Sequence, residues 1–179
     1  MSDSPLIVFS HGNSFPASTY NVVFDDLRRR GFRVTAVEKF GHDARYPVTN
    51  NWPHLVEQLS DFVKPLAANA PVFLVGHSLG GFLSLMTAAK HPDWVRGVVM
   101  LDSPLVAGWR ARILRVGKRI PMAEALSPAA LSRHRRNTWA NEAEAFEHFA
   151  SKKVFARWDP RVLHDYVSHG THDLSLIHI

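Results

Sequence analysis

The segment Gly76-His77-Ser78-Leu79-Gly80 sets a serine between two glycines in the pattern G-x-S-x-G. An apolar run over 71–75 precedes it, and an apolar, helix-forming stretch over 82–89 follows it. A serine at so tight a strand-to-helix turn has a strained backbone, and its hydroxyl projects above the sheet. Side chains two positions before and after the serine would collide, which explains the glycines. The pattern predicts that Ser78 is a nucleophile; the alternative is a glycine-rich turn without a catalytic role.

A second loop offers what a nucleophilic serine also needs, which is a set of amide groups that stabilise negative charge. His11-Gly12-Asn13 directly follows an apolar run that we predict to be a strand. We expect the backbone N–H groups of Asn13 and Leu79 to form an oxyanion hole, because an amide from such a loop and the amide after the nucleophile can converge. The helix that starts near Leu79 directs its amides to the same place. We interpret His11 as a structural hydrogen-bonding residue.

The elements that must position these residues are apolar strands separated by helices. Four runs have the continuous apolar character of strands that are covered on both faces; they are 5–10, 32–38, 71–75 and 95–101. Strands that alternate with helices predict an α/β fold with a doubly wound, mostly parallel sheet. Ligands on such a sheet bind at the carboxyl ends of its strands. We therefore expect His11, Ser78 and Asp102 to meet at one edge.

Asp102 is the candidate acid of a catalytic triad, because it directly follows the strand predicted over 95–101. The alternative is a hydrogen-bonding residue that anchors the next segment or caps a helix. We interpret His77 as pocket wall and not as the base, since neighbouring residues at such a turn point in different directions. We do not favour His172 as the base either, because no predicted strand precedes it.

From 103 to 168 the sequence changes to short amphipathic helices that are broken by prolines. Its large apolar side chains either roof an apolar pocket or form a small core of their own; they are Trp109, Met122, Leu126, Trp139, Phe146, Phe149, Phe155 and Trp158. The part over 105–136 is rich in arginine and lysine. Such a surface can attract acidic partners, but we favour a solvated helix face. No nucleic-acid-binding motif accompanies the charge, so we expect no nucleic-acid partner.

The composition is that of an ordinary globular domain. The chain has 179 residues, 46% apolar and 21% charged, with a net charge of +5. Cysteine is absent, which excludes disulfides and thiol chemistry. No run approaches the roughly 20 apolar residues of a membrane span. We see no secretory signal and no metal-ligand spacing, so we expect a cytoplasmic protein without a metal.

The strand-to-helix turn over 76–80, which we call the elbow, and the His-Gly loop together resemble the α/β-hydrolase superfamily. They are most similar to its serine esterases, lipases and amidase-like members. The resemblance covers 5–104 well and the following helical stretch loosely. It implies a core over 1–103, a helical cap over 104–168 and a tail over 169–179. It also implies hydrolysis through an acyl-enzyme, without a cofactor. The bond cleaved would be a carboxylic ester, or less readily an amide or thioester, and the substrate would be apolar and small to medium in size. Carbon–carbon hydrolysis, perhydrolysis and non-catalytic ligand binding remain alternatives.

The family's fold continues for two more strands after the cap, and these normally bring the acid and the catalytic histidine. We expect both strands to lie beyond Ile179, and we interpret the apolar ending, 174–179, as non-native sequence. Ser78 would then lack its base, and loss of a triad histidine costs on the order of 10⁶ in kcat. We therefore expect this chain to be inactive or weakly active, with Asp102 or a later residue as the acid.

Overall fold

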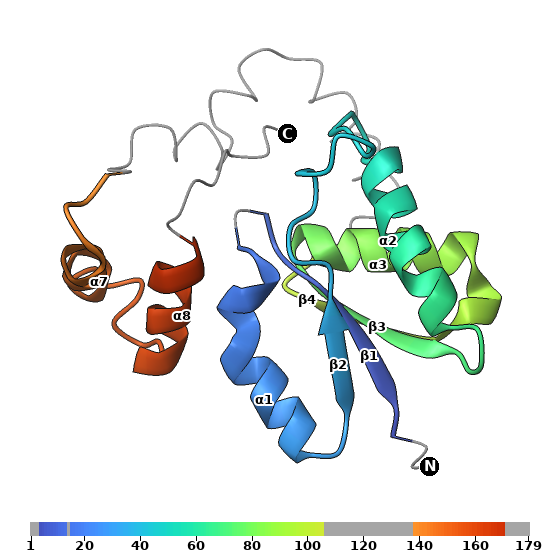
Figure 1. Ribbon diagram of the computed structural model, residues 1–179, viewed down its shortest axis with the longest axis horizontal. Coiled ribbons are helices and arrows are strands. Elements are labelled where there is room, and N and C mark those ends of the chain that lie inside the picture. Colours follow the sequence, from blue (N-terminus) through green and yellow to red (C-terminus); the bar gives the residue numbers. More distant parts are fainter. Residues whose placement is uncertain (1–3, 14, 106–137, 171–179) are drawn as a thin grey trace.

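A computed structural model describes residues 4–13, 15–105 and 138–170. In this part of the chain a four-stranded, fully parallel sheet has the order β2-β1-β3-β4 (Figure 1). Its strands are β1 (Leu6–Ser10), β2 (Arg33–Ala36), β3 (Val72–His77) and β4 (Val95–Leu101). Val8 pairs with Thr35 on β2 and with Leu74 on β3, so the ends of these strands lie level. The predicted parallel α/β sheet is confirmed.

Helices cover both faces of this sheet, as a doubly wound fold requires. They are η1 (Ala17–Tyr20), α1 (Asn21–Arg29), α2 (Pro53–Leu66), α3 (Leu79–Lys90) and the single turn η2 (Pro92–Trp94). Figure 1 shows α1 on one side of the sheet and α2 with α3 on the other. Leu59 and Leu83 pack with Val8 and Leu74 in the larger core, under α2 and α3. Phe9 packs with α1 in the smaller one.

The two faces are covered to different extents. Under α2 and α3 the larger core is fully closed, with Leu59, Leu74 and Leu83 inaccessible to solvent. On the α1 side the outer strand is partly open, since Val99 and Leu101 of β4 are 48% and 42% exposed. β4 is the outermost strand of the described sheet, and it pairs with β3 alone in this part of the chain.

Several element boundaries differ from those that the sequence predicts. β3 runs on to His77, two residues past the predicted strand, while β2 is shorter than the predicted 32–38. α2 begins at Pro53, because Trp52 before it has a left-handed backbone with φ 54°. Proline fixes the φ of a helix's first turn and needs no hydrogen bond there, so it is a natural first residue.

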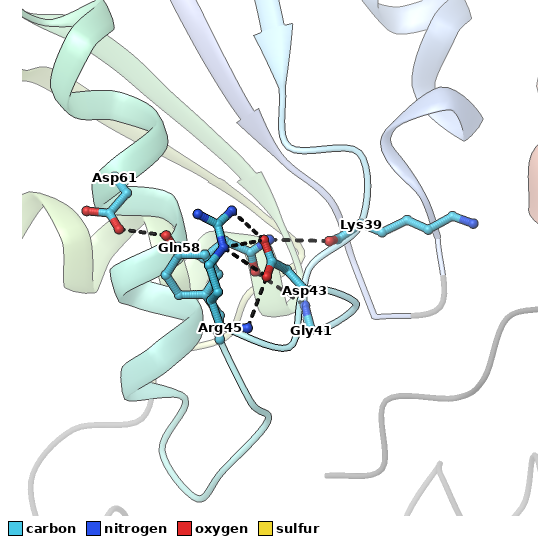
Figure 2. Close-up of polar contacts among 7 residues, drawn as sticks. Lys39, Gly41, Asp43, Arg45, Gln58 and Asp61 are labelled. Atoms are coloured by element: carbon cyan, nitrogen blue, oxygen red, sulfur yellow. Dashed lines mark hydrogen bonds and ion pairs between the residues drawn. The ribbon is translucent and has the colours of Figure 1, made fainter.

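The loop between β2 and α2 is fastened to α2 by polar contacts (Figure 2). The Gln58 side chain accepts from Gly41 N at 3.4 Å and donates to the Lys39 carbonyl at 3.5 Å. The Tyr46 hydroxyl donates to Asp61 Oδ2 at 2.6 Å. These contacts hold the loop without involving the carboxyl end of β3.

A helical pair, α7 (Glu142–Ala150) and α8 (Pro160–Gly170), follows the sheet in the sequence, and α8 packs on η1 and α1. The pair has its own core of Ala145, Leu163 and Val167. Of the apolar side chains whose role the sequence leaves open, four pack against this core; they are Trp139, Phe146, Phe149 and Phe155. Trp158 lines a pocket instead. Trp109, Met122, Leu126 and most of the basic stretch lie outside the described residues.

Candidate active site

Ser78 sits at the junction between β3 and α3, which begins one residue later at Leu79. Its backbone has φ 51° and ψ −115°, a combination that L residues rarely adopt. The amide of Ser78 donates to the carbonyl of Leu101 at 2.9 Å, so the end of β4 supports the turn. The serine is half-buried. The strained strand-to-helix turn that the G-x-S-x-G pattern predicts is therefore present.

Close backbone contacts explain both glycines of the pattern. A Cβ atom on Gly76 would lie 2.2 Å from the carbonyl oxygen of Gly80, and one on Gly80 would lie 2.0 Å from that of Ser10. The neighbours are backbone atoms that cannot move aside. The first turn of α3 therefore rests directly on the carboxyl end of β1, and this contact brings the loop after β1 against the elbow.

His11 holds the start of that loop with both of its ring nitrogens. Nδ1 lies 2.8 Å from the carbonyl oxygen of Gly12, and Nε2 accepts from the amide of Phe40 at 2.8 Å. Burial lowers the pKa of His11 to about 4, against the opposing effect of the Gly12 carbonyl. The imidazole is thus neutral at neutral pH and fully used in hydrogen bonds. The prediction that His11 is structural is confirmed.

Tyr20, at the end of η1, is part of the site, and the sequence pattern does not reveal this. Its hydroxyl accepts from the amide of Gly12 at 3.1 Å and lies 2.7 Å from His77 Nδ1. Burial raises the pKa of Tyr20 to about 12. In the sequence Tyr20 is one of several apolar or aromatic residues at helical spacing, so only the sheet's topology shows that it reaches the elbow.

Of the two predicted oxyanion-hole residues, Leu79 belongs to the turn at Ser78 and Asn13 to the loop after β1. Leu79 is the first residue of α3, where backbone amides have no intrahelical acceptor. Asn13 is half-buried in the loop after β1, and its Oδ1 atom is shielded from solvent without a hydrogen-bond partner among the described residues. The packing of α3 on the end of β1 places both segments at the same edge of the sheet.

Asp102 directly follows β4 and is exposed, with a left-handed backbone at φ 47°. Burial lowers the pKa of His77, and the Asp102 carboxylate opposes that shift. Ser103, which the sequence does not single out, links β4 to the elbow, because its hydroxyl donates to the Ser78 carbonyl at 2.8 Å. His172, the late histidine that we do not favour as the base, lies outside the described residues.

An apolar pocket of about 300 Å³ opens beside the elbow, between α8 and the η1–α1 segment. Its wall includes His77, which precedes the serine in the sequence, and Leu101, whose carbonyl accepts from the serine amide. Trp158 and Tyr166 close it from the α8 side, and the Tyr166 ring contacts the ring of Phe15 in the loop after β1 in a tilted arrangement, at a centroid distance of 5.4 Å. The pocket wall that was predicted for His77 is confirmed.

The described ranges show neither a metal site nor a membrane-spanning helix. Within 4–13, 15–105 and 138–170, no three His, Cys, Asp or Glu side chains gather as metal ligands would. No helix in the same ranges has the length and apolar character needed to cross a bilayer.

Comparisons with known proteins agree with this fold. The model of the Alpha/beta hydrolase family matches residues 7–175. The monoglyceride lipase of Rattus norvegicus is 31% identical over 107 residues, which is 56% of this chain and 35% of that protein. The 2-(acetamidomethylene)succinate hydrolase of Mesorhizobium japonicum is 33% identical over 104 residues, which is 55% of this chain and 35% of that protein. This chain thus covers about a third of each relative.

Among solved structures, the crystal structure of E-2-(acetamidomethylene)succinate hydrolase superposes with a TM-score of 0.63 at 21% identity. The match covers 94% of this chain and 57% of that one. At this identity the likeness concerns the fold alone.

Proposed function

The chain belongs to the alpha/beta hydrolase family, and from this premise we propose that it is a serine hydrolase that cleaves a carboxylic ester. The observation that carries the proposal is the backbone of Ser78, whose φ of 51° occurs at a strand-to-helix turn enclosed by two obligatory glycines. A strained residue of this kind persists only where the surrounding structure enforces it, and such residues cluster at reactive sites. Both named relatives are themselves hydrolases by name.

The reaction proceeds through an acyl-enzyme. Ser78 Oγ attacks the ester carbonyl while a base takes its proton, and the carbonyl oxygen becomes an oxyanion. The tetrahedral intermediate collapses, the bond to the alcohol oxygen breaks, and the base returns the proton to the departing alcohol. A water molecule then attacks the acyl-enzyme in the same manner and releases the acid and the free serine.

The oxyanion is stabilised by the backbone amides of Leu79 and Asn13. Support comes from the position of Leu79 at the start of α3, where amides are free of intrahelical partners. Removing one donor of such a site costs about 10² to 10³ in kcat. The close packing of α3 on Ser10 keeps the two amide-bearing segments at a fixed separation.

The base, in this proposal, is a histidine outside the described residues. His11 uses both ring nitrogens in structural hydrogen bonds, and His77 faces Tyr20 through Nδ1. The acid that orients the base is Asp102 or a further residue that the described ranges do not include. Asp102 has the position for this role, since it is exposed at the carboxyl end of β4 beside the elbow.

The substrate is a small to medium ester with an apolar group that enters the pocket beside the elbow. Support comes from its volume of about 300 Å³ and from the aromatic and aliphatic side chains that form its wall. Tyr166 of α8 and Trp158 of the segment between α7 and α8 contribute to that wall, so this helical region acts as a cap over this part of the site. A largely apolar wall binds by burial of apolar surface and places few demands on hydrogen-bonding groups.

The test is hydrolysis of a series of p-nitrophenyl esters from acetyl to octanoyl, beside the matching anilides and thioesters. Ser78→Ala should abolish ester turnover, and medium acyl chains should be preferred. Ser84→Ala is the matched control, because the Ser84 hydroxyl is buried in α3 with no hydrogen-bond partner among the described residues. Turnover that survives Ser78→Ala would refute the mechanism. Ligand binding without turnover, in a wild-type protein that includes the triad histidine, would instead identify a non-catalytic binder.

A further inference from the structure

A chain of hydrogen bonds connects the loop after β1 to the elbow strand. The amide of Gly12 donates to the Tyr20 hydroxyl at 3.1 Å, and this hydroxyl lies 2.7 Å from Nδ1 of His77, the residue before the nucleophile. The three groups come from β1's loop, from η1 and from β3. They also fit tightly, because a Cβ atom on Gly12 would lie 2.6 Å from His77 Nδ1 and 3.2 Å from the Tyr20 oxygen.

The chemistry of the three groups sets the direction of this chain. An amide can only donate, so the tyrosine oxygen accepts at Gly12. A tyrosine hydroxyl has a single hydrogen, and the arrangement that satisfies every group sends it to His77 Nδ1, which accepts. The proton of neutral His77 is then on Nε2. Each link is polar and partly buried, so loss of one link leaves its partner group without a hydrogen bond.

The ionisation states of both side chains agree with this direction. Burial lowers the pKa of His77, while Asp102, the charged group that acts on it from the end of β4, raises it less. Burial raises the pKa of Tyr20 to about 12. At neutral pH both groups are therefore uncharged, as a hydroxyl that accepts from an amide and donates to an imidazole requires.

We propose that Tyr20 is a positioning residue, which fixes the loop after β1 relative to Ser78. It does so through a relay of hydrogen bonds from Gly12 N–H to the Tyr20 hydroxyl and from that hydroxyl to His77 Nδ1. The inference rests on the proposed function, since the positioned group is the amide of Asn13, next to Gly12. By accepting the Gly12 amide, Tyr20 sets the orientation of the peptide planes that lead to Asn13. Misplacement of a preorganised donor by a fraction of an ångström weakens transition-state stabilisation more than substrate binding.

The alternative is that the relay only stabilises the fold. The two differ in what Tyr20→Phe should change, because a purely structural bond affects the free energy of unfolding and leaves kcat of the folded molecules intact. The positioning role instead predicts a lower kcat with nearly unchanged KM. The pair His77→Asn and His77→Leu adds a second discriminator, since the asparagine Oδ1 can accept where Nδ1 does and leucine cannot.

The experiment compares Tyr20→Phe with Tyr46→Phe, a matched loss of a hydroxyl that donates to Asp61 far from the relay. Amide hydrogen exchange of Gly12, the ¹⁵N shifts of the His77 ring and the rate of Ser78 acylation are measured on each folded protein. We expect Tyr20→Phe to raise Gly12 exchange tenfold or more and to slow acylation at least tenfold, with KM within twofold. His77→Asn should retain most of the wild-type rate, and His77→Leu should match Tyr20→Phe.

Three results would overturn the inference. The first is a rate of Gly12 amide exchange in Tyr20→Phe that equals the rate in Tyr46→Phe. The second is an unchanged rate of Ser78 acylation in Tyr20→Phe although Gly12 exchanges faster. The third is a wild-type His77 ring that is protonated on Nδ1. Failure of the proposed function is a separate outcome, in which the wild-type serine does not react at all. The relay is then still decided by Gly12 exchange and the His77 tautomer, and the catalytic consequence falls with the function.

Discussion

The turn at Ser78 and the loop after β1 lie side by side at one edge of the sheet, but they are held by different forces. The elbow is defined by steric exclusion. A Cβ atom on Gly76 would lie 2.2 Å from the nearest backbone atom, and one on Gly80 would lie 2.0 Å from its own nearest backbone atom. The loop is held by directional hydrogen bonds, from His11 to the Gly12 carbonyl and from the Gly12 amide to Tyr20. Steric contacts tolerate no added atom, while hydrogen bonds respond to protonation and to the loss of single partners.

The largest effect should follow from Gly80→Ala. Its new Cβ would overlap the Ser10 carbonyl at 2.0 Å, and neither backbone can yield. We expect destabilisation of more than about 4 kcal/mol or no folded protein, measured by circular dichroism and urea unfolding. Gly97→Ala on β4 is the control, since its Cβ would meet only the movable Phe73 ring at 3.3 Å. A stable Gly80→Ala protein would contradict a sterically defined elbow.

Acid should weaken the hydrogen-bonded loop. The pKa of His11 falls from 6.5 to about 4 on folding, so the folded state binds fewer protons than the unfolded chain between these values. The contribution of neutral His11 to the free energy of unfolding is about 3 kcal/mol. It is complete above pH 6.5 and is lost as the pH falls toward 4. Urea unfolding of wild type and His11→Gln at pH 7.5 and pH 4 isolates this contribution. Equal pH dependence of the two proteins would contradict it.

Gly12→Ala tests the place where the two kinds of constraint meet. Its Cβ would stand 2.6 Å from His77 Nδ1, a side-chain atom that can shift at a cost. We expect a loss of about 1–2 kcal/mol in unfolding free energy together with slower acylation of Ser78. Combined with Tyr20→Phe, the loss should be smaller than the sum of the single effects, because both break the same relay. Strict additivity would separate Gly12 from the relay.

The smallest effect should come from Ser103→Ala. This change removes the hydroxyl that donates to the Ser78 carbonyl at 2.8 Å, at a partly buried site. We expect a loss of about 1 kcal/mol and a nearly unchanged reactivity of the serine, since the glycine contacts maintain the turn. Thermal unfolding together with ester hydrolysis measures both. A large loss of activity in a stable Ser103→Ala protein would show that the elbow also depends on hydrogen bonding.

These two regions also show which parts of the site can be predicted from the sequence. Steric demands leave a local pattern, so Gly76, Ser78 and Gly80 were sufficient to predict the turn that the structure contains. The partnership of Tyr20 with His77 joins residues 57 positions apart, and no local pattern encodes it. The role of Asp102 stays a prediction, although its place after β4 is as expected.

The same distinction applies to the fold. Largely apolar runs predict the four strands, because burial on both faces of a parallel sheet favours apolar side chains. The boundaries of β2 and β3 were less well predicted, since β2 is shorter than expected and β3 runs on to His77. The aromatic residues of the helical pair could not be divided between core and pocket, since Phe149 and Trp158 are alike in type and differ only in their neighbours.

The reactivity of Ser78 toward a fluorophosphonate probe tests the central claim most directly. The folded protein, including the triad histidine, is incubated with the probe, digested and analysed by peptide mass spectrometry, beside Ser78→Ala and Ser84→Ala. The account predicts one adduct, on Ser78, that is lost in Ser78→Ala and kept in Ser84→Ala. An adduct on another residue, or none on a protein that unfolds cooperatively, would contradict it.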